Sequence, residues 1–307
     1  ILLDDFLFPK ITGLDYSKNL IENPIIPLSD LVEGEYSMYE DYDIYNAPEL
    51  MNCYTFSSAC DVYSFAVITY ELITDENPFQ DGRSDEGYRP VFKETIPNCY
   101  KQLIEKCWDQ DPKKRPTFEE IVNHMKTNQE FITENVDKEE FLNYIKFTEE
   151  FREKSINNEI FELDNYIQTQ NERFRKIKIN YNKLRDWLRI NLTVNIGASD
   201  LSKYSKQKKL GNGSFGNVYK ILDKQNDIVY AAKISIYEMD QCSEDTIMNL
   251  SREIDIISSI KYQSILQFIG FCPKNFKGKP KPVIITELAA NGSLEDILEN
   301  ERKGFAN

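Results

Sequence analysis

Three closely spaced glycines, Gly211, Gly213 and Gly216, are the first residues whose spacing could serve chemistry. Because glycine has no Cβ, it lets backbone N–H groups approach phosphate oxygens closely. Dinucleotide-binding folds use similar glycines, but there the glycines open a helix. Here a strand-like run follows at Val218–Leu222, and a turn cluster separates it from a second run at Ile228–Tyr237. We therefore expect the glycines at the tip of a β-hairpin that could hold the phosphates of a nucleotide.

A lysine on the second strand could provide the charge that phosphates need. The two-residue repeat of a strand places Ala231 and Lys233 on one face, where the small side chain leaves room for a flat base. The run Ser251–Ile254 falls in a helix, and its Glu253 could pair with the lysine and hold it extended. The plainer alternative is a surface lysine on an edge strand. A buried strand at Pro282–Leu288 then leads into a turn and a new helix.

This ordered set resembles the small lobe of a protein kinase, with a glycine-rich loop, a strand lysine, a helix glutamate and a hinge. The runs at residues 265–272 and 286–294 are similar to those of the tyrosine-kinase-like group, whose members mostly modify serine and threonine. The resemblance covers about residues 205–300. Four motifs in the same order are more specific than the glycines alone.

The resemblance implies roles for individual residues. Lys233 would contact the α- and β-phosphates of ATP, and Glu253 would pair with it as the second member of the organising pair. Thr286 would be the gatekeeper residue, and the backbone of Glu287 and Ala289 would bind adenine. The ATP-binding residues implied in this way are Leu210, Gly211, Asn212, Gly213, Ser214, Phe215, Gly216, Val218, Ala231, Lys233, Thr286, Glu287 and Ala289.

The early part of the chain contains a second set of kinase-like motifs. The run Tyr45–Leu50 resembles the Ala-Pro-Glu motif that closes an activation segment. The run Asp61–Ala66 resembles the large-lobe helix whose aspartate holds the catalytic loop. Further along, Cys107-Trp108 and Arg115–Phe118 are similar to the end of a tyrosine-kinase-like large lobe.

Three residues of this set would have structural roles by resemblance. Glu49 and Arg115 would form a buried ion pair, and Asp61 would tie down the catalytic loop. A planar guanidinium can hold a carboxylate through two parallel hydrogen bonds, which agrees with such a pair. Taken singly, Asp61 and Arg115 would be ordinary surface charges, but the ordered set is hard to explain otherwise.

Two strand-like runs at the start, Ile1–Asp5 and Pro9–Ile11, resemble the strands that follow a kinase catalytic loop. The next positions should read Asp-Phe-Gly, but residues 13–15 read Gly-Leu-Asp, so Gly13 occupies the place of the Mg²⁺-binding carboxylate. The chain has a single histidine, His124, and no His-Arg-Asp catalytic loop. We therefore assign no metal ligand and expect the chain alone to be inactive.

A helical connector is predicted between the two kinase-like parts, at residues 128–200. Apolar residues recur there in alternating steps of three and four from residue 156 to residue 188, which is the period of a heptad seam. One interpretation is a helical hairpin packed on a neighbouring lobe, and the other is a dimerising coiled coil. Aromatic residues at several seam positions favour the hairpin, so self-association through residues 156–188 is the alternative.

The composition excludes several other classes of protein. The 307 residues carry a net charge of −14, which argues against nucleic acid or an anionic membrane surface as the main partner. No apolar run approaches the roughly 18 residues that a membrane-spanning helix needs. The six cysteines lack the two-residue spacing of a redox or zinc motif, so we expect reduced thiols in a cytoplasmic protein.

These observations predict an α+β protein with protein-kinase-like lobes in reversed order. A helical large-lobe remnant, of pseudokinase type, would occupy residues 1–127, a helical linker residues 128–200, and an antiparallel β small lobe with one main helix residues 201–307. Since Ile1 lies inside an apolar run, we expect a partial chain cut from tandem kinase domains.

The expected function is ATP binding and phosphoryl transfer to protein serine or threonine by the full polypeptide. Mg²⁺ would take part only where the missing catalytic segment is present. The alternative is a non-catalytic pseudokinase that acts as a scaffold or regulator and associates with itself through residues 156–188. The protein substrate is not encoded in any motif that we recognise.

Overall fold

The structure is a computed structural model of the chain, and it falls into two compact units. One, here called the sheet unit, contains residues 1–17 together with the described residues 201–300. The other, here called the helical unit, contains the described residues from 20 to 149 and from 301 to 304. The structure describes residues 1–5, 8–14, 17, 20, 24–27, 44–52, 55–79, 87–93, 95–133, 137–146, 149, 201–213, 216–260, 262 and 264–304.

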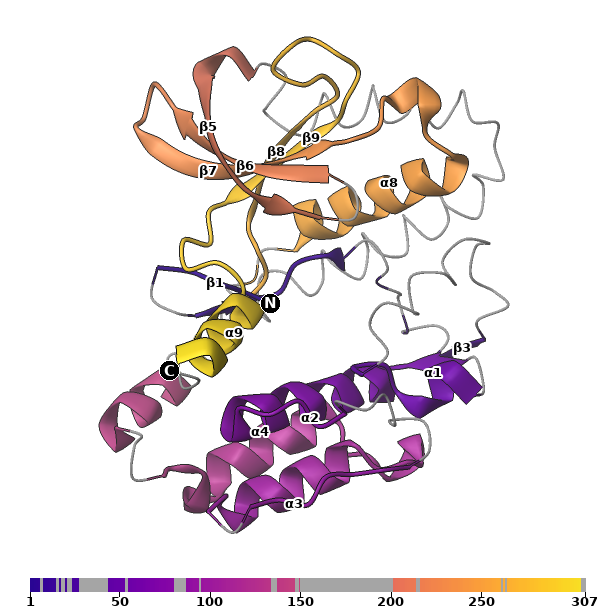
Figure 1. Cartoon of the computed structure of the whole chain (residues 1–307), viewed down its shortest axis with the longest axis vertical. Helices are drawn as coiled ribbons and strands as arrows, with labels where there is room; N and C mark the ends of the chain where they lie inside the picture. The colour runs from indigo at the N-terminus through magenta and orange to yellow at the C-terminus, as the bar shows by residue number, and fades with distance from the viewer. Residues whose placement is uncertain are drawn as a thin grey trace. The chain divides into compact units, whose positions relative to one another are not determined.

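The helical unit contains several helices and one short strand pair (Figure 1). Its helix α4 begins with a capping box, in which the side chains of Thr117 and Glu120 each accept a hydrogen bond from the other's backbone N–H. Asp75 caps the carboxyl end of helix α2, and its φ of 55° is the left-handed conformation that terminates many helices. The elements are β3 (Ile25–Pro27), α1 (Pro48–Asn52), β4 (Thr55–Ser57), α2 (Ser58–Thr74), α3 (Asn98–Cys107), η4 (Pro112–Lys114), α4 (Phe118–Thr127) and η5 (Gln129–Phe131).

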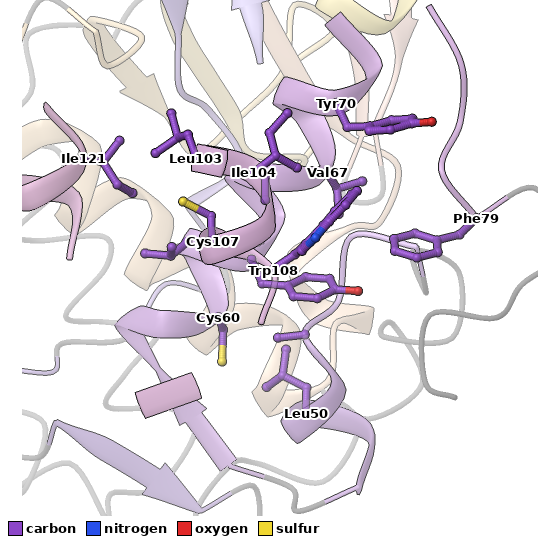
Figure 2. Close-up of a cluster of buried hydrophobic side chains, with 14 of the residues drawn as sticks. Leu50, Cys60, Val67, Tyr70, Phe79, Leu103, Ile104, Cys107, Trp108 and Ile121 are labelled. Carbon is purple, nitrogen blue, oxygen red and sulfur yellow. The ribbon is translucent and has the colours of Figure 1, made fainter. Parts of the chain in front are cut away.

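A core of aliphatic, aromatic and cysteine side chains holds these helices together, and Figure 2 shows it. Trp108 lies at the end of α3, where its ring packs against those of Tyr70 and Phe79 at centroid distances of 5.5 and 6.2 Å. Arg89 lies over the Trp108 ring at 5.6 Å and donates to the Trp108 carbonyl oxygen. The side chain of Arg89 therefore covers an aromatic cluster and satisfies a backbone group at the same time.

The sheet unit is built on a five-stranded antiparallel sheet with the strand order β5-β6-β7-β9-β8. One long helix, α8, accompanies the sheet, and α9 starts shortly after the last strand (Figure 1). The elements are η6 (Leu201–Lys203), β5 (Tyr204–Asn212), β6 (Gly216–Asp223), β7 (Ile228–Ser235), η7 (Met239–Gln241), α8 (Glu244–Ser259), β8 (Phe268–Cys272), β9 (Val283–Glu287) and the part of α9 (Leu294–Gly304) up to residue 300. This mixture of helices and antiparallel sheet confirms the predicted α+β class.

The two faces of the sheet differ in what covers them. Ile221, Ala232 and Ile285 belong to one buried cluster on the first face. On the opposite face, Ile284 packs in a second cluster with residues of α8 that include Ile254. Because side chains alternate along a strand, the same second face also carries the side chain of Lys233, which lies opposite Ile284.

Two very short strands near the start of the chain, β1 (Leu2–Leu3) and β2 (Pro9–Lys10), form an antiparallel pair. They lie in the sheet unit, where Leu2 bridges Ser293 and Ile11 bridges Ile265. The sequence motifs predict that residues 1–127 form one large-lobe remnant, whereas the structure groups residues 1–17 with the sheet unit. Strands of two residues carry no sequence signal that could identify their partner.

The predicted connector falls mostly outside the described residues. Residues 138–146 are helical, but the heptad seam at residues 156–188 is not among the residues that the structure describes. Within the described ranges, no helix is both long and apolar enough to span a bilayer.

Candidate nucleotide site

The glycine-rich segment forms the tip of the β5–β6 hairpin. Gly213 and Gly216 close it, because the N–H of each donates to the carbonyl oxygen of the other at 2.8 and 3.2 Å. Gly211 lies opposite Val218 and Asn212 opposite Asn217 in the strand pairing that leads to the tip. The predicted site residues Ser214 and Phe215 lie outside the described residues.

The glycines of this hairpin have different surroundings. A Cβ at Gly216 would collide with the backbone carbonyl of Ile234 on the neighbouring strand, so glycine permits close strand pairing there. A Cβ at Gly211 would meet nothing within 4 Å. Gly211 therefore borders open space, which is what a loop that receives phosphate groups requires.

Lys233 and Glu253 come from different elements and meet beside the sheet. Lys233 lies on β7, and its Nζ is 2.9 Å from both carboxylate oxygens of Glu253 on α8. The Glu253 side chain is 7% exposed and the Lys233 side chain 20% exposed. Helix α8 is fixed by the apolar cluster that contains Ile254, next to the glutamate in sequence. Burial of the carboxylate and partial exposure of the ammonium group leave the lysine able to meet an anion.

Several predicted site residues share the sheet face of Lys233. Val218 lies opposite Lys233 on β6, and Ala231 lies two residues before Lys233 on the same strand. Thr286 lies opposite Ala231 on β9. Residues directly opposite in a ladder project to the same face, so these side chains gather beside the ammonium group. Leu210, near the tip of β5, is 42% exposed.

The backbone after β9 carries the predicted adenine contacts. The N–H of Glu287 donates to the Gln267 carbonyl at 2.9 Å, and the Glu287 carbonyl accepts from the Thr286 hydroxyl at 3.1 Å. The Glu287 carboxylate accepts from the N–H of Gln267 at 2.8 Å. Ala289 follows in the partly exposed stretch that leads to α9. These hydrogen bonds to Gln267 and Thr286 fix the backbone at Glu287, where the segment after β9 begins.

Sequence reasoning missed Lys10 as a neighbour of this segment. Lys10 is 7% exposed, and its Nζ lies 3.2 Å from the carboxylate of Glu287 and 3.9 Å from that of Asp4. A lysine buried to this extent needs such partners. No spacing rule connects position 10 with position 287, so only the fold could reveal the contact.

In the helical unit, Glu49 and Arg115 form a doubly hydrogen-bonded pair. The two terminal nitrogens of Arg115 donate to the two carboxylate oxygens of Glu49 at 2.7 and 2.8 Å. Arg115 also donates to the carbonyl oxygens of Ala59 and Asp109. Asp61 lies in the first turn of α2 with an exposed side chain. Its predicted role concerns a catalytic loop that this sequence does not contain.

The described residues do not fit a divalent metal ion. Gly13, at the position where a kinase would carry its metal-binding carboxylate, has a φ of 75° and no side chain to offer. Throughout the described ranges, no group of three or more His, Cys, Asp or Glu side chains is arranged to hold a metal ion. Asp15, which follows two residues later, lies outside the described residues.

Comparison with protein families places both parts of the chain in one family. The model described as "Protein tyrosine and serine/threonine kinase" matches residues 38–125, and the model described as "Protein kinase domain" matches residues 204–307. These two stretches include the Glu49–Arg115 pair and the Lys233–Glu253 pair.

Curated relatives are also protein kinases. The dual specificity protein kinase shkE of Dictyostelium discoideum is 41% identical over 91 residues, which cover 27% of this chain and 13% of that protein. The dual specificity protein kinase pyk3 of the same organism is 32% identical over 135 residues, or 41% of this chain and 9% of that protein. Serine/threonine-protein kinase 12 of Arabidopsis thaliana is 39% identical over 93 residues, or 27% and 20%.

The matched stretches thus amount to a fifth or less of the length of each of these three relatives. The family models and the relatives nevertheless agree with each other. They also agree with the hairpin, lysine, glutamate and hinge that the sheet unit contains. The chain belongs to the protein kinase family.

Proposed function

We propose that residues 201–307 are the ATP-binding small lobe of a serine/threonine protein kinase of the tyrosine-kinase-like group. The observation that carries the proposal is the Lys233–Glu253 pair, with 2.9 Å between the ammonium nitrogen and each carboxylate oxygen. The pair stands on the sheet face that begins at the glycine hairpin, where Val218 lies opposite Lys233. A surface lysine on an edge strand would not be expected to pair with a buried carboxylate, and Lys233 lies on β7, the central strand of the sheet.

Each part of the site would have its own task. The ammonium group of Lys233, held extended by Glu253, would bind the α- and β-phosphates of ATP. The backbone N–H groups of the hairpin would approach the phosphates because Gly211 borders open space. Ala231 and Thr286 would border the adenine, and the backbone of Glu287 and Ala289 would hydrogen-bond it.

Phosphoryl transfer to protein serine or threonine would belong to the full polypeptide and not to this chain. The transfer needs a catalytic aspartate and metal ligands, which the sequence lacks in any recognisable motif. The names of the relatives support a protein acceptor, since all three are called protein kinases. Where the missing segment is present, Mg²⁺ would neutralise charge on the phosphates.

We also propose that the two matched stretches come from tandem kinase domains, so that large-lobe motifs precede small-lobe motifs. The order of the two family matches supports this, with residues 38–125 before residues 204–307. A cytoplasmic location is proposed as well. It is supported by Cys60, Cys99, Cys107 and Cys242, whose thiols are not joined in disulfides within the described part of the chain, as expected in a reducing compartment.

The test is to measure ATP binding by the intact chain with titration calorimetry. Lys233→Met should weaken binding by about 10-fold or more, the loss expected for a charge-assisted hydrogen bond worth about 1.5–3 kcal/mol. Lys208→Met is the matched control, because Lys208 is an exposed lysine on β5 and its loss should leave the affinity unchanged. Equal affinities in all three proteins would refute the proposal.

The non-catalytic alternative rests on one observation, the glycine at position 13. The relatives do not favour it, because their names describe kinases. Self-association through residues 156–188 concerns residues outside the described ranges. Sedimentation of the whole chain would test it, and a strict monomer would remove it.

A further inference from the structure

The amino-terminal hairpin of β1 and β2 contacts the sheet unit at two places. At one end it runs beside the stretch between β9 and α9 (Figure 1). The Leu3 N–H donates to the Gly292 carbonyl at 2.9 Å, and the Leu3 carbonyl accepts from the N–H of Asn291 at 3.2 Å. The Ile1 carbonyl accepts from the N–H of Leu294 at 3.0 Å. Backbone bonds in both directions make this a short strand pairing and not a chance side-chain contact.

The other end of the hairpin pairs with a different stretch of the unit. The N–H of Ile11 donates to the Ser264 carbonyl at 2.7 Å, and the Ile11 carbonyl accepts from the N–H of Leu266 at 3.0 Å. Ile11 is thereby bridged in parallel to Ile265. Since the two contacted stretches are separate in sequence, the hairpin ties the segment before β8 to the segment after β9.

Charge and apolar packing support the same docking. Lys10 of the hairpin is 7% exposed and is paired with Glu287 at 3.2 Å. Leu14, just past the hairpin, packs against the apolar cluster of α8 that contains Ile254 and Ile257. If the hairpin left, Glu287 would lose its ammonium partner and the apolar patch under Leu14 would be uncovered, and both changes would be unfavourable.

We infer that the hairpin at residues 1–12 is an integral part of the sheet unit and docks there within its own chain. Two strands of two residues each are too short to be stable alone, so the hairpin depends on the unit for its structure. In return it holds residues 287–294 in place. If residues 201–307 bind ATP as proposed above, the hairpin also positions the adenine-binding backbone of Glu287 and Ala289.

The hairpin therefore docks on a different lobe from the one that its resemblance implies. By resemblance it follows a catalytic loop and precedes large-lobe motifs, so it would serve the domain that begins before it. In the structure it is bonded to a lobe that starts at Leu201, on the far side of those motifs in sequence. The docking surface formed by residues 264–266 and 291–294 therefore binds the hairpin from the amino-terminal part of the chain.

Disulfide cross-linking of the intact chain tests the docking. Leu2 and Ser293 form a bridge without direct hydrogen bonds between them, a pairing in which Cα atoms lie about 4.5 Å apart and a disulfide is sterically possible. Leu2→Cys/Ser293→Cys and Ile11→Cys/Ile265→Cys should each give an internal disulfide in most molecules under mild oxidation in dilute solution. Peptide mass spectrometry must identify the bond, because the chain has native cysteines.

The control pair is Ile11→Cys/Ile228→Cys, since Ile228 is exposed and starts β7 just after a turn. It should form little internal disulfide. Cross-linked dimers in place of internal bonds would show docking on a second copy and overturn the inference. Equal yields for matched and control pairs would overturn it too. None of these measurements uses a nucleotide, so their outcome is independent of whether the chain binds ATP.

Amide hydrogen exchange provides a second test. Ile11→Pro removes the N–H that donates to Ser264, whereas Ile11→Ala removes the same half-exposed side chain but keeps that N–H. The proline variant should exchange faster at Leu266, Asn291 and Leu294, whose N–H groups donate to hairpin carbonyls. The alanine variant should match the original chain. Unchanged exchange in the proline variant would contradict the inference, and if that variant fails to fold, the cross-linking decides alone.

Discussion

At the scale of single residues, Arg115 has the most completely satisfied side chain of the predicted set. It donates to both oxygens of Glu49 and to two backbone carbonyls, and its guanidinium carbon lies 5.1 Å from the centre of the Tyr63 ring. The side chain of Arg115 is fully buried and that of Glu49 is 7% exposed. Removing one member would leave the other as an uncompensated buried charge.

Arg115→Ala should therefore lower the free energy of unfolding by about 3–5 kcal/mol. Arg115→Lys should rescue little of this loss, because an ammonium group cannot reproduce the fork that meets two oxygens at once. Chemical denaturation monitored by circular dichroism measures both. The control is Lys93→Ala, which breaks an exposed pair with Glu76 and should leave the denaturation midpoint nearly unchanged. Full rescue by lysine would contradict the bidentate geometry.

Two buried thiols make the stability depend on pH in the alkaline range. Burial, reinforced by the negative charge of Glu49, raises the pKa of the Cys60 thiol to about 12. Burial also raises the pKa of Cys107 to about 12, against the opposing effect of Arg115. The unfolded thiols lose their protons near pH 9, while the folded ones keep them. The folded state is therefore favoured fully below about pH 9, and this contribution is lost as the pH rises toward 12.

Raising the pH from 8 to 10 should consequently lower the free energy of unfolding by on the order of 1 kcal/mol for each of these thiols. Cys60→Ala/Cys107→Ala should show a smaller drop over the same interval, measured by denaturation at both pH values. Buried tyrosines with raised pKa values begin to contribute near pH 10, where unfolded tyrosine loses its proton, and they are present in both proteins. Parallel stability curves for the two proteins would rule out the thiols as the cause.

At the scale of elements, the β5–β6 hairpin contains one glycine that strand pairing requires and another that borders open space. Gly216 permits β6 to pair closely with β7, where a Cβ would meet the Ile234 carbonyl. Gly211 has no neighbour within 4 Å of its Cβ position. The two positions therefore form a matched pair for the same substitution.

Gly216→Ala should destabilise the sheet unit, because backbone must move to admit the methyl group. Gly211→Ala should leave the unfolding midpoint within error but weaken ATP binding, since the methyl group would occupy space beside the phosphates. Thermal denaturation and calorimetry with ATP separate the two effects. A Gly211→Ala chain with unchanged affinity would mean that the phosphates do not pass this glycine.

Sequence patterns predicted the elements of the sheet unit well because each motif is local. The hairpin, the strand of Lys233 and the helix of Glu253 follow from turn residues and from repeats within about ten residues. The ammonium–carboxylate contact could be anticipated because an ordered set of motifs restricts the fold. The docking of Lys10 on Glu287 could not, since β1 and β2 are too short to encode a partner and the bond spans almost the whole chain.

At the scale of the whole molecule, the amino-terminal residues 1–17 belong to the same unit as the proposed nucleotide site. By resemblance, Gly13 takes the place of the metal-binding carboxylate in the first kinase-like part. The structure joins residues 1–17 to the sheet unit, with Leu14 packed against the cluster of α8. Gly13 is thus an element of the unit that carries Lys233 and Glu253. A nucleotide bound there would find no carboxylate at this position for a metal ion.

ATP binding by the chain should accordingly be nearly independent of Mg²⁺, and the chain should transfer no phosphoryl group. Calorimetry with ATP in the presence of Mg²⁺ or of a chelator measures the first, and mass spectrometry after incubation with ATP the second. Gly13→Asp should introduce a Mg²⁺ dependence, because it adds a hard oxygen ligand where a positive φ is tolerated by aspartate. Gly13→Asn controls for the backbone effect without adding the charge. Tighter binding with Mg²⁺ in the unaltered chain would place a metal ligand elsewhere, and phosphorylated products would show that a catalytic base exists outside any recognised motif.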